Sequence, residues 1–428
     1  MKNDNDIEKL YPIYLRFKTI TTDSRNVPHN SIFFALKGSH FNGNEYALSA
    51  LDKGAAIAIV DEEKYKINDN CFLVDDVLET LQKLALYHRK KLSIPVIGIT
   101  GSNGKTTSKE LIHAVLAAQY KCKATIGNLN NHIGVPLSIL KIDADDDIAI
   151  IEMGANHIGE IEELCQIACP SHGIITNIGK AHLEGFLNFE NIINTKIALY
   201  NYVRKYGHSV FVNADDDLLM SLSENIKRTT YSINNKGDIN ASTINSDIHL
   251  NVLWHNIEIK THLCGLYNIY NVLAAISVGK FFGVDDEKIV KAITEYIPQN
   301  NRSQLIKTNN NTLIMDAYNA NPTSMEKALN SFSEMPLTDK VVILGDMLEL
   351  GSESLNEHKK IIDIIKSNAF EKVFLVGTIF KTANNTDFEN FENAEMLKAH
   401  LIKHPLKNKS ILIKGSRGIK LETILGAL

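Results

Sequence analysis

The chain has 428 residues, of which 44% are hydrophobic and 22% charged, and its formal net charge is −5. This composition is typical of a folded globular protein and excludes a mainly disordered chain, while the negative charge argues against non-specific binding to nucleic acid or anionic membranes. The N-terminus lacks the apolar core of a signal peptide, and no apolar run approaches the roughly 18 residues that span a bilayer. We therefore expect a cytoplasmic protein with small-molecule partners and about three domains.

Residues 1–92 are predicted to form a small α/β domain. Strands are expected over Ile32–Leu36 and Ala55–Val60, with a helix over Asn44–Lys53. A polar loop, Thr22–Arg25, precedes these elements, and a second, Lys37–Gly43, lies between the first strand and the helix. An arginine and loop N–H groups suit a diphosphate, although composition alone favours ordinary solvated turns.

The strongest local motif is Val96–Thr107, an apolar strand that breaks into a glycine-rich turn and continues as a helix. Backbone N–H groups of such a turn surround an anion, Lys105 can reach the outer phosphates, and Thr106 can offer its hydroxyl to Mg²⁺. The strict Walker pattern is not met, because Ile99 stands where the first glycine is required. We nevertheless interpret the turn as a nucleoside triphosphate loop, because strand, Gly-Lys-Thr-Thr and helix coincide.

Residues 93–300 alternate short apolar strands with helices, as in a parallel sheet covered on both faces. Strands are expected over Pro95–Thr100, Asp147–Met153, His172–Ile178 and Ser209–Asn213, and helices over Thr106–Tyr120, His157–Ala168 and Asn191–Tyr206.

Ligands of such sheets gather at the carboxyl ends of the strands, so polar residues there are candidates. Glu152 ends one strand and is a suitable Mg²⁺ ligand, because this cation prefers hard carboxylate oxygens. His182 follows the next strand and could complete a second site. Its spacing is equally consistent with a structural histidine.

The pattern changes near residue 240. The segments 240–251 and 257–263 read as alternating strands of an antiparallel extension, and a helix is expected over Gly265–Ala275. Asn268 and Asn271 share one face near its start, where they could hydrogen-bond a base. Helix capping explains Asn268 equally well but explains Asn271 poorly.

A polar break at Ile297–Ser303 separates a third α/β domain, residues 301–428, which is predicted to be Rossmann-like. Its expected strands are Thr312–Asp316, Lys340–Leu344, Lys372–Val376 and Ser410–Lys414, with helices from Ser324 and over Leu355–Ser367 and Ala394–His404. Polar residues again follow three of these strands, in Asp316–Pro322, Gly345–Gly351 and Lys414–Gly418.

Together these motifs resemble the Mur ligase family over nearly the whole chain, and the departure from the Walker spacing is itself a trait of that family. The matching segments are T-G-S-N-G-K-T-T at Thr100–Thr107, E-M-G at Glu152–Gly154, T-N-I-G-K-A-H-L-E at Thr176–Glu184, N-R-S-Q at Asn301–Gln304 and K-G-S-R at Lys414–Arg417. Two more, D-A-Y-N-A-N-P at Asp316–Pro322 and L-G-D-M-L-E-L-G at Leu344–Gly351, are typical of its dipeptide-adding members. The D-N-P-R signature of the diaminopimelate- or lysine-adding members is missing.

The resemblance implies an ATP- and Mg²⁺-dependent amide ligase of peptidoglycan precursor synthesis, which adds D-alanyl-D-alanine to a UDP-N-acetylmuramoyl-tripeptide through an acyl phosphate. The first domain would bind the UDP substrate and the central domain ATP, while the third would close on ATP and bind the dipeptide. Implied ATP contacts are Gly101, Ser102, Asn103, Gly104, Lys105, Thr106, Thr107, Asn268, Asn271, Arg302 and Asp316. Implied UDP contacts are Ser24, Arg25, Asn42 and Gly43, and the implied dipeptide side comprises Tyr318, Asn319 and Asn321.

The resemblance also implies Thr106, Glu152, His182 and a carbamylated Lys196 as metal ligands, with Lys105, Glu152, His182 and Lys196 as the catalytic set. From the sequence alone, Lys196 is an ordinary exposed helix lysine. Tyr267 departs from the histidine that many relatives have before Asn268.

Two rival functions are another ligase of this superfamily, such as a folylpolyglutamate synthetase, and an ATPase switch that changes protein partners. The sequence leaves open the third residue of the acceptor tripeptide and the arrangement of the domains. We expect a monomer.

Overall fold

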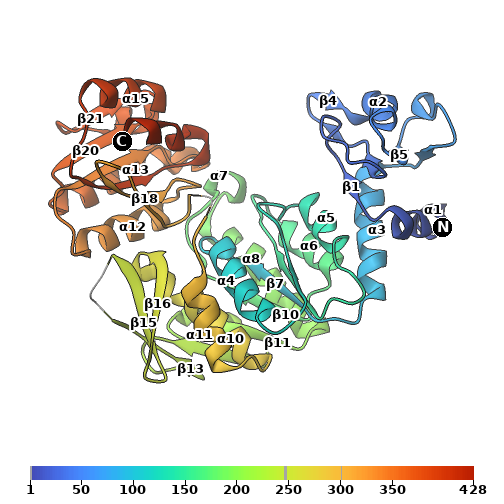
Figure 1. The fold of residues 1–428 in the computed structure, drawn as a ribbon, viewed down its shortest axis with the longest axis horizontal. Coiled ribbons are helices and arrows are strands. Elements are labelled where there is room, and N and C mark those ends of the chain that lie inside the picture. The colour runs from blue at the N-terminus through green and yellow to red at the C-terminus, as the bar shows by residue number, and fades with distance from the viewer. Residues whose placement is uncertain (1, 245–247, 300) are drawn as a thin grey trace.

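The computed structural model describes residues 2–244, 248–299 and 301–428. Three α/β domains follow one another along the molecule, with the N-terminal sheet at the upper right of Figure 1, the central domain in the middle and the C-terminal domain at the upper left. The predicted fold class is confirmed. No helix among the described residues is both long and apolar enough to span a membrane.

The N-terminal sheet is parallel, in the order β1-β2-β5-β6. Its strands are β1 (Ile20–Thr21), β2 (Ile32–Phe34), β5 (Ile57–Val60) and β6 (Cys71–Leu73), and a hairpin of β3 (Lys37–Gly38) and β4 (Phe41–Asn42) lies beside it. The helix expected over residues 44–53 forms as a 3₁₀ turn, η1 (Gly43–Tyr46), followed by α2 (Ala47–Asp52).

Two helices that the sequence pattern did not single out join this sheet to the central domain. They are α1 (Lys2–Phe17) and α3 (Val77–Lys91), and α3 packs on α5 (Gly134–Ile139) and α6 (Glu160–Ala168). Apolar side chains of α1 and α3 share one continuous core with the central domain. Figure 1 shows both helices beneath the N-terminal sheet, with α3 next to the central domain.

The central sheet has seven parallel strands in the order β13-β12-β11-β10-β7-β9-β8. Successive residues of β7 and β9 alternate between two apolar cores, because strand side chains point to opposite faces. Helices α4 and α10 cover one face and α6 and α8 the other. The strands are β7 (Val96–Thr100), β8 (Cys122–Ala124), β9 (Ile148–Glu152), β10 (His172–Ile175), β11 (Ser209–Asn213), β12 (Arg228–Ser232) and β13 (Ile239–Asn240). The remaining helices are α4 (Lys105–Ala117), α7 (Leu183–Phe186), α8 (Phe189–Tyr206), α9 (Asp217–Leu222), α10 (Ile269–Phe281) and α11 (Asp286–Glu295).

The predicted antiparallel strands form, but as a separate sheet of β14 (Ser242–Ile244), β15 (His249–Trp254) and β16 (Ile257–Cys264), while Asn240 belongs to β13 of the central sheet. Residues 245–247 of the predicted segment 240–251 lie outside the described residues, as does residue 300, the predicted end of the central domain.

The C-terminal sheet has the order β17-β18-β22-β19-β20-β21, parallel except for β17. Its strands are β17 (Gln304–Lys307), β18 (Thr312–Asp316), β19 (Lys340–Gly345), β20 (Lys372–Val376), β21 (Glu389–Phe391) and β22 (Ser410–Lys414). Its helices are α12 (Pro322–Glu334), α13 (Ser354–Ser367), α14 (Thr378–Ala383) and α15 (Ala394–Lys403). Cores on both faces bury this sheet, with α12 and α13 on one side and α15 on the other.

Candidate active site

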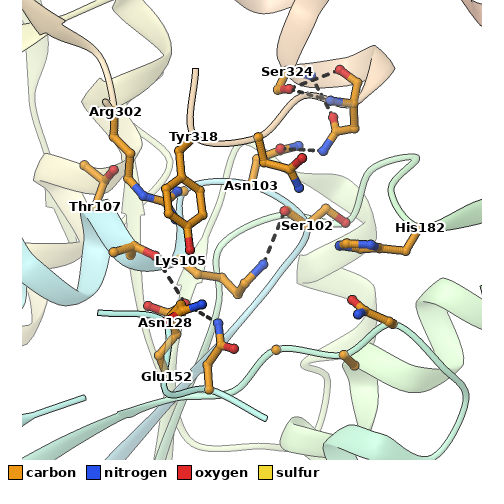
Figure 2. A pocket seen from close by; sticks show the side chains of 18 of the residues that line it. Ser102, Asn103, Lys105, Thr107, Asn128, Glu152, His182, Arg302, Tyr318 and Ser324 are labelled. Carbon is orange, nitrogen blue, oxygen red and sulfur yellow. Dashed lines mark hydrogen bonds between the residues drawn. The ribbon is translucent and has the colours of Figure 1, made fainter. Parts of the chain in front are cut away.

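A cavity of about 500 Å³ lies between the central and C-terminal domains, at the carboxyl ends of β7, β9 and β18. Figure 2 shows side chains of both domains pointing into it. The structure thus brings together most of the predicted ATP, metal and dipeptide residues. Those lining the cavity are Ser102, Asn103, Gly104, Lys105, Thr106, Thr107, Glu152, His182, Asn268, Asn271, Arg302, Asp316, Tyr318, Asn319 and Asn321.

The glycine-rich turn has a backbone that only glycine adopts without strain. Gly101 and Gly104 have φ of +142° and +80°, and a Cβ on Gly104 would lie 2.7 Å from Oδ1 of Asn271. The turn leads into α4, which begins at Lys105. The first N–H groups of a helix have no partner inside it, so the turn can bind an anion.

The amine of Lys105 lies over this turn. Its Nζ donates to the carbonyl oxygens of Gly101 at 2.6 Å and Ser102 at 3.3 Å (Figure 2). Burial lowers the pKa of Lys105, while the negative charge of Glu152 opposes that shift. The lysine is therefore held beside the loop that would carry phosphates.

Glu152 is buried at the end of β9, and only one of its two carboxylate oxygens has hydrogen-bond partners among the described residues. Its Oε1 accepts hydrogen bonds from Thr106 Oγ1 at 3.2 Å and Asn130 Nδ2 at 2.8 Å. Its Oε2 is buried and has no hydrogen-bond partner among the described residues. A buried carboxylate oxygen without a partner is costly, so the position fits a bound cation. Asn130 belongs to no sequence motif, so its place beside Glu152 could not be predicted from the sequence.

His182 lines the cavity from the segment between β10 and α7, with φ of +51°. Its Nδ1 lies against the carboxylate of Glu349, which comes from the C-terminal domain. That contact with His182 is the main cause that lowers the pKa of Glu349. Of the two readings left open by the sequence, the structure places His182 at the cavity rather than in a core.

The sequence predicts that Lys196 is exposed on its helix, and this prediction is wrong. Only 2% of the surface of Lys196 is accessible. Burial, reinforced by the charge of Lys105, lowers its pKa well below the ordinary lysine value, and Glu160 opposes the shift. Its Nζ lies 5.7 Å from the centre of the Phe186 ring. Neither Lys196 nor Gly101 lines the cavity, but each lies near Lys105, which does.

The C-terminal domain supplies a cation above the phosphate loop. The guanidinium of Arg302 stacks on Tyr318, 3.6 Å from the ring centre (Figure 2), and Arg417 lies 5.5 Å from the same ring. Buried Nε of Arg302 has no hydrogen-bond partner among the described residues. Asp316 accepts from Lys414 Nζ at 2.6 Å and from the backbone of Ser303 at 3.2 Å.

Asn268 and Asn271 face the cavity as a linked pair. Asn271 Nδ2 donates to Asn268 Oδ1 at 2.8 Å, and Asn268 Nδ2 donates to the carbonyl of Cys264 at 2.7 Å. The side chain of Asn268 makes no capping hydrogen bond, so the capping interpretation was wrong. Tyr267, the departure noted in the sequence, bonds Ser303 Oγ through its hydroxyl at 3.0 Å.

The predicted UDP residues lie apart from this cavity, in the N-terminal domain. Arg25 is exposed and pairs with Asp23 at 2.9 Å. Asn42 bonds Glu62 at 2.8 Å and caps the turn that begins at Gly43. Ser24 offers its carbonyl to Lys53. These loops satisfy their polar groups locally, and the structure does not bring them to the other site residues.

Comparisons with known proteins find related sequences over nearly the whole chain. Three family models match the chain, described as "Mur ligase family, catalytic domain" (residues 16–89), "Mur ligase middle domain" (99–279) and "Mur ligase, glutamate ligase domain" (301–417). A protein of Bacillus subtilis (strain 168) named UDP-N-acetylmuramoyl-tripeptide–D-alanyl-D-alanine ligase is 33% identical, over 95% of this chain and 92% of its own length.

Solved structures of similar fold also cover nearly the whole chain. A crystal structure of MurF from Acinetobacter baumannii superposes with a TM-score of 0.86 at 29% identity, covering 96% of this chain and 93% of that one. MurF ligase from Thermotoga maritima in complex with ADP superposes with a TM-score of 0.84 at 25% identity, covering 96% and 97% of the two chains.

Proposed function

This chain belongs to the Mur ligase family of ATP-dependent amide ligases, and we propose that it adds D-alanyl-D-alanine to a UDP-N-acetylmuramoyl-tripeptide. The observation that carries the proposal is the cavity in which the phosphate loop, Glu152 and Arg302 meet the segment Asp316–Pro322. That segment and Leu344–Gly351 are the motifs typical of dipeptide-adding members. The Bacillus subtilis relative named UDP-N-acetylmuramoyl-tripeptide–D-alanyl-D-alanine ligase aligns with 95% of this chain.

The first proposed step joins two anions. The terminal carboxylate of the tripeptide attacks the γ-phosphorus of ATP, the bond to the β–γ bridging oxygen breaks, and an acyl phosphate and ADP are formed. At about 4 Å, two like unit charges repel by roughly 4 kcal/mol at an effective dielectric constant of 20. Lys105 below and Arg302 above the cavity would cancel this charge, and the unpartnered Nε of Arg302 is available for a phosphate oxygen.

We propose that Thr106, Glu152, His182 and carbamylated Lys196 would hold Mg²⁺, which when bound supplies positive charge to the phosphate oxygens. The unpartnered Oε2 of Glu152 supports this assignment. Burial of Lys196 supports its carbamylation, because its lowered pKa favours the uncharged amine that reacts with CO₂.

In the second step the amine of the dipeptide displaces phosphate from the acyl phosphate and forms the amide. We propose that residues 301–428 close over ATP and that Tyr318, Asn319 and Asn321 border the dipeptide. Holding three substrates in line can supply roughly 7–11 kcal/mol of the barrier. A closed cavity would also exclude the water that hydrolyses an acyl phosphate.

For the remaining substrate contacts, we propose that residues 1–92 bind the uridine diphosphate through Ser24, Arg25, Asn42 and Gly43. Residues 93–300 would then carry ATP, with the adenine beside Asn268 and Asn271 and the ribose beside Asp316. The guanidinium of Arg25 is exposed but paired with Asp23, so a diphosphate would have to replace that carboxylate as its partner. Our expectation of a cytoplasmic monomer stays a prediction, which cell fractionation and sedimentation would test.

The test is phosphate release from ATP with each substrate omitted in turn. We expect release only when both the UDP-linked tripeptide and D-alanyl-D-alanine are present, and acceptors with lysine or diaminopimelate would identify the third residue. Release with another amino acid in place of the dipeptide would favour a different ligase of the family. Release that needs neither substrate but requires a protein partner would favour the ATPase switch.

A further inference from the structure

The segment Leu344–Gly351 resembles a motif that is typical of dipeptide-adding Mur ligases, but it does not line the cavity. It leaves the end of β19 and leads into the 3₁₀ turn η4 (Gly351–Glu353) before α13. Its last residues lie against α7 of the central domain. The segment therefore forms part of the contact between the two domains that enclose the cavity.

The first half of this segment is anchored inside the C-terminal domain. The buried carboxylate of Asp346 accepts hydrogen bonds from the backbone of Ile379 at 2.9 Å and Phe380 at 2.8 Å. The next residue, Met347, donates its N–H to Nε2 of buried His358 at 3.0 Å. Leu348 donates its N–H to Ser416 Oγ at 2.9 Å. Asp346, Met347 and Leu348 are thus each held in place by hydrogen bonds within the C-terminal domain.

Glu349 follows these anchored residues with φ of +65°, a left-handed conformation that is uncommon outside glycine. Its carbonyl accepts the N–H of Glu184 at 3.2 Å, and its carboxylate lies against Nδ1 of His182. The backbone and the side chain of one residue therefore both contact the segment of the central domain that carries His182.

This contact bears on which nitrogen of His182 could bind a cation. A carboxylate only accepts hydrogen bonds, so in a neutral imidazole it favours the tautomer with the proton on Nδ1, which would leave the Nε2 lone pair to a metal. Metal-bound histidines commonly have their other nitrogen held in this way by a carboxylate. Stability alone does not explain the contact, since 52% of the Glu349 side chain is exposed and such pairs contribute about 0–1 kcal/mol.

We propose that Glu349 is a positioning residue that orients His182 for the metal, and that it does so only while the C-terminal domain is docked. The proposal rests on the proposed role of His182 as a ligand. Glu349 and His182 come from different domains, so docking of the C-terminal domain would also complete the metal site.

The direct test measures metal binding without turnover. Mn²⁺ would be titrated into the full-length protein with ADP present, and free Mn²⁺ followed by electron paramagnetic resonance. We expect Glu349→Gln to weaken Mn²⁺ binding about tenfold. Loss of a group that holds a metal-bound histidine typically weakens metal binding by about 10–100-fold, and this is the lower limit of that range. The matched control is Glu353→Gln, an exposed carboxylate four residues later, which should bind as the wild type does. Unchanged binding by Glu349→Gln would overturn the proposal, as would no saturable binding by the wild type.

A second measurement separates positioning from a general disturbance of the loop. For Glu349→Gln, kcat should fall at low Mg²⁺ and recover at saturating Mg²⁺, with KM for the dipeptide unchanged. A loss that persists at all Mg²⁺ concentrations would contradict the positioning role. A wild-type protein that ligates no dipeptide would refute the proposed function, whereas the Mn²⁺ titration would still decide the role of Glu349.

Discussion

The central domain meets its two neighbours through contacts of different chemistry. On the N-terminal side, α1 and α3 continue its apolar core, and buried Tyr14 and Arg89 bond its carbonyl groups. On the C-terminal side, Cys264 and Leu183 of the central domain pack against the neighbouring core, but polar contacts also join the two domains: Asn321 donates to Asn103 at 2.8 Å, and Lys180 pairs with Glu357 at 3.3 Å. Apolar burial resists separation, whereas polar groups can exchange one another for water at small cost. We infer that the N-terminal contact is permanent and that the C-terminal one opens and closes.

The largest expected effect concerns the cavity at the polar contact. Replacing Lys105 with alanine removes a positive charge placed at the phosphates, so kcat should fall by at least about 10²–10³-fold. Ligation is measured with saturating substrates, and thermal unfolding should be unchanged. Lys121→Ala, an exposed lysine just beyond α4, serves as the control. Wild-type ligation by Lys105→Ala would refute the assignment of this cavity.

Removing Lys196 should also abolish most activity, by about 100-fold on the scale of a lost metal-site group. If the lysine acts as a carbamate, high concentrations of acetate or another short carboxylate should partly restore ligation by Lys196→Ala. Lys205→Ala, on the same helix but exposed, should ligate normally. Full activity of the Lys196 variant would exclude the carbamate role.

At the apolar contact the expected effect is on stability. Buried Arg89 donates to the carbonyls of Ala168 at 3.0 Å and Cys169 at 3.2 Å, besides two carbonyls near its own helix. Arg89→Ala would leave these groups unpartnered and should lower the free energy of unfolding by about 3 kcal/mol. Urea unfolding measures this, with exposed Lys90→Ala for comparison. An unaltered midpoint would show that the two domains are held by the apolar side chains alone.

The same contact should weaken in acid because of His88, which lies buried between Tyr14 and the carbonyl of Ile142. Burial lowers the pKa of His88, so the unfolded chain takes up its proton first as the pH falls. Stability should therefore decline below the ordinary histidine pKa of about 6.5. The free energy of unfolding is measured from pH 7.5 to 5. It should decline less steeply for His88→Gln than for the wild type. Equal slopes would show that His88 is not the group responsible.

The smallest effect is expected from an isolated polar contact of the C-terminal domain. Lys180 is 48% exposed and its pair with Glu357 should contribute at most about 1 kcal/mol, equal to roughly fivefold in an equilibrium. Lys180→Ala should raise KM for ATP by no more than that and leave thermal unfolding unchanged. A much larger rise in KM would mean that this one pair governs docking.

The sequence predicted the strands best. The expected limits of β11, β18, β20 and β22 agree with the structure to the residue, because strands buried on both faces are continuous apolar runs with polar ends. The helices α1 and α3 were missed, since their apolar faces are completed by the central domain rather than by their neighbours in sequence.

By itself, the sequence determined the α/β fold, the phosphate loop and the polar residues at the strand ends, because local spacing places them there. Tertiary structure alone decided the surroundings of Lys196, whose burial depends on side chains such as Phe186 packed over its helix. It also brought Asn130 to Glu152 and Glu349 to His182. Burial and pairing depend on which groups meet in space, and these residues are 22 and 167 positions apart along the chain.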